Sequence, residues 1–77
     1  MLFEIWIEGH HTTGMEEPVH AKLIGYHAGD DFLDACRKAS KGTFFTGYGE
    51  FKEDNGVCSV WGCKLFNNKT DAQKSFG

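Results

Sequence analysis

The residue types that could do chemistry in this 77-residue chain are four histidines, three cysteines and several neighbouring carboxylates. A structural zinc site places its Cys or His ligands at short, fixed spacings. Here His10 and His11 are adjacent in a polar loop, while His20 and His27 have opposite parity along a predicted strand. The spacing therefore predicts solvated histidines and no metal site.

The cysteines are predicted to be packing residues. Their odd number argues against a closed disulfide framework, so reduced thiols are expected. Cys36 falls on the apolar stripe of a predicted helix, where a free cysteine packs as a small hydrophobic group, whereas reactive thiolates prefer cationic, partly exposed surroundings. Cys58 and Cys63 are predicted to point to opposite faces of a sheet. Because no nucleophile–base constellation is evident, we expect a protein that is not an enzyme.

The acidic pairs and the glycines also have structural explanations. The pairs at positions 16–17, 30–31 and 53–54 suit loop solubility, helix capping and turn polarity, respectively. The glycines do not form a phosphate-binding sequence, so no cofactor is expected. Gly49 and Gly62 are predicted to face each other across a hairpin, which favours close approach of another group.

Composition narrows the class of protein. A net charge of −3 argues against binding to the phosphate backbone, so no direct nucleic-acid partner is expected. The length predicts a single domain, residues 1–77. A domain of this size buries only about 60% of the surface of its unfolded chain. Because such a small core gives little stability, we expect a homodimer. No apolar run reaches the ~18 residues of a membrane span, and the start lacks a basic n-region. We expect a cytoplasmic protein with no leader and no membrane contact.

Apolar periodicity predicts the elements of the first half. Residues 2–8 alternate strictly, and residues 19–27 suit a second strand that pairs with the first through a polar loop at 9–18. Residues 31–41 have apolar positions at three- and four-residue steps, which is typical of a helix. Asp31 with Asp34 resembles a capping box, and Gly42 suits a left-handed stop.

A hairpin and a final helical turn are predicted for the second half. Asn55 followed by Gly56 is the strongest short signal for a type I′ turn. That turn sets Phe51 opposite Val60, Glu50 opposite Trp61 and Tyr48 opposite Cys63, within one strand that continues to Phe66. Asn68 or Thr70 is then placed to cap a short helical turn. The predicted fold class is α+β: a four-stranded, mainly antiparallel sheet in the order β-β-α-β-β, with one main helix on one face and a short C-terminal helical turn.

A single helix covers only one face of such a sheet. The predicted helix side carries Phe3, Ile5, Ile7, Val19, Leu23, Phe51 and Val60. The other face is predicted to display Ile24 together with aromatic residues, and to have a charged fringe that includes Lys22. Its candidate partner-binding residues are Trp6, Tyr26, Tyr48, Trp61, Glu4, Glu8 and Glu50. Contiguous apolar patches usually mark interaction sites. Either the C-terminal segment 65–76 covers this face, or a second copy or a partner does.

Distinctive residues occur in the segments 3–9, 23–25, 32–36 and 61–66, in the pair Thr13 and Gly14, at Ala72, and in the ending 75–77. Together these segments resemble a family of small, mostly uncharacterised proteins of phages and mobile elements. Many phage proteins of this size bind and disable a host system, as anti-CRISPR and other anti-defence inhibitors do. The resemblance therefore implies a host protein as the partner.

The sequence is compatible with three functions. The first is a non-enzymatic binding protein of phage or mobile-element type that occupies a host protein. The second is a small-molecule module, such as a nucleotide sponge, with its pocket at an oligomer seam. The third is a metal-binding accessory protein.

Overall fold

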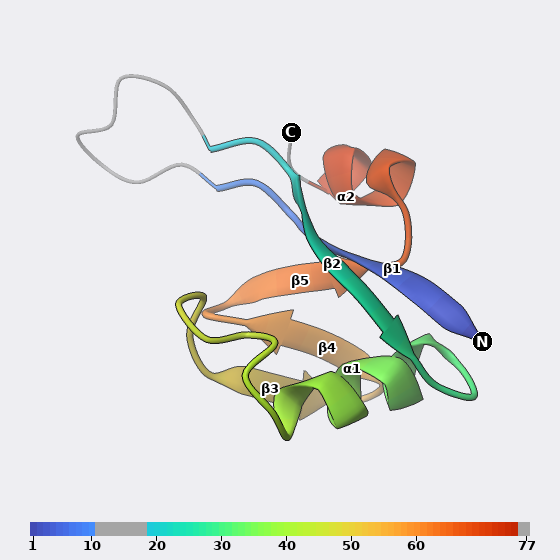
Figure 1. Ribbon diagram of the computed structural model, residues 1–77. Coiled ribbons are helices and arrows are strands. Elements are labelled where there is room, and N and C mark those ends of the chain that lie inside the picture. Colours follow the sequence, from blue (N-terminus) through green and yellow to red (C-terminus); the bar gives the residue numbers. More distant parts are fainter. Residues whose placement is uncertain (11–18, 76–77) are drawn as a thin grey trace.

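The computed structural model describes residues 1–10 and 19–75, and it confirms the α+β class (Figure 1). In chain order, the elements are β1 (Leu2–Ile7), β2 (Lys22–Ala28), α1 (Phe32–Ser40), β3 (Phe51–Asp54), β4 (Val57–Val60), β5 (Cys63–Phe66) and α2 (Lys69–Ser75). The strands form one antiparallel sheet in the order β2-β1-β5-β4-β3. The described residues thus hold five strands, and the prediction of four is wrong.

The additional strand arises because residues 57–66 do not run on as one strand. The chain reverses at Trp61 and Gly62, so that Val60 pairs with Cys63. The predicted pairing of Phe51 with Val60 is confirmed, but the pairing of Tyr48 with Cys63 is wrong. The reversal brings β5 back along β4 and delivers it beside β1 in the centre of the sheet.

The first two strands pair as predicted, but a bulge changes the register. Ile5 lies opposite Gly25 and Trp6 lies opposite Leu23, so Ile24 is the extra residue of the bulged strand. Because side chains alternate between faces, the bulge moves Leu23 to the face of Trp6, away from the predicted helix side. Ile24 instead packs against the core cluster.

Helix α1 begins as its sequence predicts and ends differently. The Asp31 side chain accepts a hydrogen bond from the Asp34 backbone N–H at 2.8 Å. The Asp34 carboxylate accepts from the Asp30 N–H at 2.9 Å, a bond that, together with Lys38, lowers the pKa of Asp34. Gly42 does not adopt positive φ, so the predicted left-handed stop is wrong. The helix instead continues into successive turns over residues 41–48.

The core lies between the sheet and α1. From the helix, Ala35, Cys36 and Ala39 are buried. Cys36 and Ala39 pack in one cluster with Ile5, Cys58, Val60 and Leu65 of the sheet. The turns at 41–48 close one side of this core with aromatic rings. The rings of Phe45 and Phe51 stack with centroids 5.6 Å apart. Residues 41–48 thus form a lid over this side of the core.

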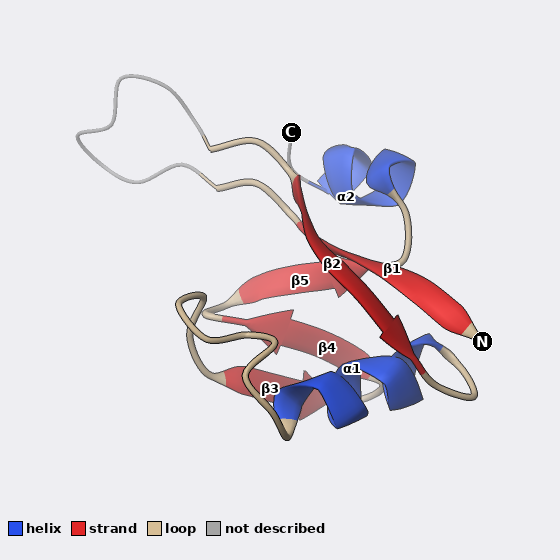
Figure 2. Cartoon of the chain, viewed as in Figure 1, coloured by secondary structure: helices blue, strands red, loops and turns tan. Residues whose placement is uncertain are grey.

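The C-terminal helix docks the end of the described chain. Asn68 caps α2, since its side-chain Oδ1 accepts from the Asp71 N–H at 2.8 Å. Ala72 is fully buried where α2 packs on β5 and β1, away from α1 (Figure 2). The Ser75 hydroxyl donates to Oε2 of Glu8 at 3.1 Å. Among the described residues, neither helix has the length and apolar character needed to cross a membrane.

All three cysteines are buried. Cys36 lies on the buried stripe of α1, as predicted. Cys58 and Cys63 share the face that carries Val60, so the prediction that they point to opposite faces is wrong. Burial raises the pKa of each thiol, most of all that of Cys36, where the neighbouring Cys58 adds to the effect.

Burial predicts how these thiols respond to alkylation. Because a raised pKa keeps Cys36 protonated and its burial excludes reagent, we expect Cys36 to react only after the chain unfolds. Mass measurement after alkylation, with and without denaturant, checks this result. Rapid labelling of Cys36 in the folded protein would contradict its placement on α1.

Candidate functional site

The turn between β4 and β5 places a tryptophan in an unusual backbone conformation. Trp61 and Gly62 have φ values of 54° and 78°, nearly the same as the 52° and 79° of Asn55 and Gly56 in the preceding hairpin. Positive φ at both central residues is the signature of a type I′ turn, for which Asn-Gly is preferred. For a bulky residue such as Trp this conformation is an outlier that costs about 1–2 kcal/mol. Strain of this kind is concentrated at functional sites.

The neighbours of Trp61 fix the direction of its side chain. Its backbone N–H donates to the Glu50 carbonyl at 3.2 Å. Gly49, at φ 127°, lies so close that a Cβ there would sit 2.8 Å from the Trp61 Cβ. The His10 ring meets the indole edge-to-face at 5.6 Å between centroids. Even so, 65% of Trp61 remains exposed, so a large apolar ring is held in place while facing solvent.

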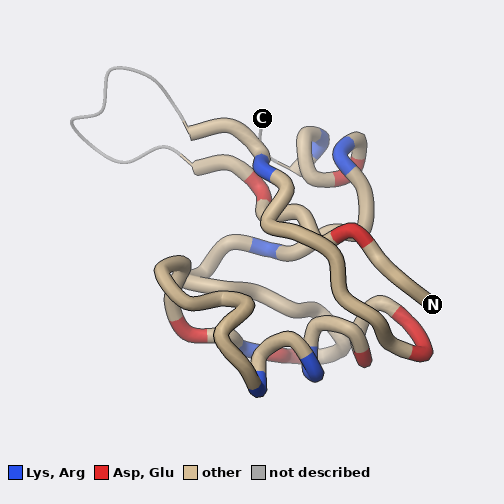
Figure 3. Tube along the Cα trace, in the orientation of Figure 1, with Lys and Arg blue, Asp and Glu red and all other residues tan. Residues whose placement is uncertain are grey.

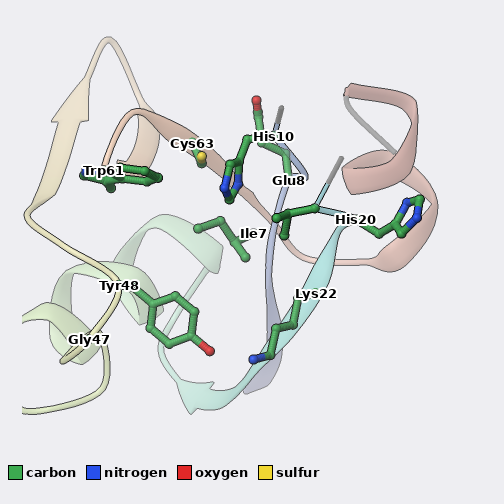
Figure 4. Close-up of a pocket in the computed structure, with 10 residues that line it drawn as sticks. Ile7, Glu8, His10, His20, Lys22, Gly47, Tyr48, Trp61 and Cys63 are labelled. Atoms are coloured by element: carbon green, nitrogen blue, oxygen red, sulfur yellow. The ribbon is translucent and has the colours of Figure 1, made fainter. Parts of the chain in front are cut away.

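A pocket of about 250 Å³ opens beside this ring (Figure 4). Its apolar lining comes from Ile7, Val19 and Cys63, and its aromatic walls from Tyr48 and Trp61. The remaining lining residues are His10, His20, Lys22, Glu8 and Gly47. The chain thus brings together the end of β1, the start of β2, the lid at 41–48 and the β4–β5 turn.

The charged side chains around the pocket, Lys22 and Glu8, make different interactions. Lys22 Nζ lies 5.8 Å from the centroid of the Tyr48 ring, within cation–π range. The Oε2 atom of Glu8 accepts from the Lys64 N–H at 3.1 Å and from the Ser75 hydroxyl at the same distance. Glu8 therefore ties β5 and α2 to the end of β1, and the ammonium group of Lys22 supplies positive charge at the pocket.

The structure divides the seven predicted partner-binding residues between two regions. Tyr48, Trp61 and Glu8 line the pocket, and Glu50 lines a second hollow that also borders Trp61. The other three, Glu4, Trp6 and Tyr26, lie on the sheet face away from α1, since Glu4 pairs with Tyr26 and shares a face with Trp6. The prediction of one continuous aromatic face is therefore wrong.

Two local features explain this correction. Tyr48 does not belong to a strand, and it packs against the core from the lid, on the α1 side of the sheet. Trp61 occupies a turn instead of a strand position. On the opposite face, the Trp6 indole N–H donates a hydrogen bond to the Glu4 carboxylate at 2.9 Å. Trp6 as a whole is only partly exposed. Of the predicted aromatic residues, only Trp61 and Tyr26 are strongly exposed.

Val19, Lys22 and His10 line the pocket, although no pattern in the sequence predicts a pocket there. The His10 and Val19 backbones exchange two hydrogen bonds, of 2.8 and 2.7 Å, which extend the β1–β2 pairing and bring His10 toward Trp61. Among residues 1–10 and 19–75, no group of three or more potential ligands is placed to hold a metal. The polar loop predicted at 9–18 falls largely outside the described residues.

Comparison of the chain with protein-family models, with curated proteins and with solved structures finds no match.

Proposed function

We propose that this chain is a non-enzymatic binding protein that occupies a partner protein through the surface around Trp61. The observation that carries the proposal is the Trp61 ring, which is 65% exposed yet held by a strained turn, Gly49 and His10. Tryptophan dominates binding hot spots, and a ring that is already fixed loses little entropy on binding.

The size of the adjacent pocket favours a protein partner over a small molecule. Pockets for small ligands usually measure about 300–1,000 Å³. At about 250 Å³, this pocket suits one apolar or aromatic side chain of a partner, inserted beside Trp61. Hot spots on the two sides of an interface tend to pair in this way. The resemblance to phage and mobile-element proteins supports a host protein, and an anti-defence role, as the more specific form of this proposal.

A small-molecule function is the second candidate, and the lining of the pocket favours it. Tyr48 and Trp61 offer aromatic surfaces for a base, and Lys22 offers a charge for a phosphate. Thermal denaturation in the presence of individual nucleotides tests this alternative. A rise in melting temperature that is lost when Lys22 is replaced by alanine would favour it over the protein-binding function.

Affinity purification from host lysate tests the proposed function. The wild-type chain is expected to retain a protein in fixed stoichiometry, and Trp61→Ala is expected to weaken that complex by about 2 kcal/mol or more. Val57→Ala is the matched control, because Val57 is also exposed, at 46%, but does not line the pocket. Equal loss with both variants, or with neither, would count against the Trp61 surface.

A further inference from the structure

The two edge strands of the sheet are protected to different degrees. Strand β3 is short, and three of its four residues, Lys52, Glu53 and Asp54, are charged. Its Glu53 also accepts two hydrogen bonds of 2.6 Å from Arg37. Strand β2 is longer and carries only one charged residue, Lys22, at its very start. Natural proteins protect exposed edges with charges and short strands, so β2 is the edge that invites pairing with another chain.

The hydrogen-bond pattern shows which groups of β2 face outward. Gly29 and Met1 exchange two backbone hydrogen bonds, of 2.9 and 3.0 Å. Hydrogen-bonded and non-hydrogen-bonded pairs alternate along an antiparallel ladder. His27, opposite Phe3, is therefore bonded inward to β1, whereas the N–H groups of Tyr26 and Ala28 point to the outer edge. In the described residues no strand lies on that side.

Exposed apolar side chains lie near the outward-facing backbone N–H groups of β2. Met1, Leu2 and Tyr26 are 84%, 69% and 55% exposed, respectively. Leu2 lies opposite Ala28, and Tyr26 lies two residues before Ala28, so Leu2 and Tyr26 are diagonal neighbours on one face. A strand added to the edge of β2 would shield this apolar surface from water.

We propose that the outer edge of β2 pairs antiparallel with the β2 of a second copy of this chain, so that one sheet runs through a symmetric dimer. Charge complementarity favours a second copy as the occupant. Lys22 begins β2 and Asp30 follows its end, so these opposite charges lie at the two ends of the strand (Figure 3). Antiparallel self-pairing sets the Lys22 end of each copy beside the Asp30 end of the other. This seam does not depend on partner binding at Trp61.

Sedimentation equilibrium over a range of concentrations tests the dimer with two edge variants. Ala28→Pro removes an outward N–H without removing a bond to β1, because proline is tolerated at the open side of an edge strand. Tyr26→Lys places a charge at the centre of the seam in both copies. Each variant is expected to raise the dimer dissociation constant roughly tenfold or more.

Val57→Lys is the matched control, since it adds the same charge at an exposed apolar position of β4. We expect the wild-type chain and this control to dimerise alike, and circular dichroism reports whether each variant is folded. If Ala28→Pro unfolds, Tyr26→Lys decides the outcome. A wild-type chain that stays monomeric, or a folded edge variant that dimerises like wild type, would overturn the proposal.

Discussion

Replacing Gly29 with alanine is expected to destabilise the fold by about 3 kcal/mol or more, at the upper end of the usual cost of overpacking. Gly29 is buried where the chain passes from β2 to α1. A Cβ there would lie 2.4 Å from the Ala35 backbone nitrogen and 2.6 Å from the Ala35 Cα. These are backbone atoms of a helix, which cannot rotate away, so α1 as a whole must shift from the sheet.

Urea denaturation followed by circular dichroism measures this effect. Gly42→Ala is the matched control, because a Cβ at Gly42 meets nothing within 4 Å and the residue does not have positive φ. The control is expected to be neutral or slightly stabilising, since alanine restricts the unfolded chain more than glycine does. Similar denaturation midpoints for the two variants would show that α1 does not approach Gly29 as closely as described.

Replacing Trp61 with asparagine is expected to weaken partner binding by about 2 kcal/mol or more, while leaving the fold intact. Asn is preferred at this position of a type I′ turn, so the free energy of unfolding should be unchanged or higher by up to about 1 kcal/mol. Asn55→Trp is the reciprocal change in a turn of nearly identical φ values, and it should destabilise by a similar amount. Thermal melts of both variants check these opposite effects.

A different result would reassign Trp61. If Trp61→Asn unfolds the chain or lowers its stability by about 3 kcal/mol, the indole is a packing residue of the kind whose truncation empties a core. The exposed fraction of 65% argues for the binding role, because most of the ring contributes no burial to folding.

Local patterns in the sequence were sufficient to predict much of the fold. The pairing of Phe51 with Val60 followed from the Asn-Gly turn, and the caps at Asp31 and Asn68 followed from short polar side chains before a helix. These features depend on residues close in sequence. The prediction of a single strand through Trp61 was wrong because tryptophan is not a usual turn residue, and aromatic residues are favoured in strands.

The candidate site was less predictable because it depends on distant segments. Tyr48 reaches the pocket from a lid that sequence patterns placed in a strand, and His10 reaches it through a bridge to Val19. The bulge at Ile24 reversed the faces of part of β2, and no residue type marks a bulge uniquely. The glycine after Trp61 was the one local signal of the turn.

The central claim, that the exposed Trp61 ring binds a partner protein, is tested most directly by using wild-type chain and Trp61→Asn as baits in parallel affinity purifications. Both baits are first shown by thermal melts to be folded. The stoichiometric partner should be retained by the wild-type chain and lost with Trp61→Asn, although the variant is at least as stable. Retention of the same partner, in the same amount, by the folded variant would contradict the claim.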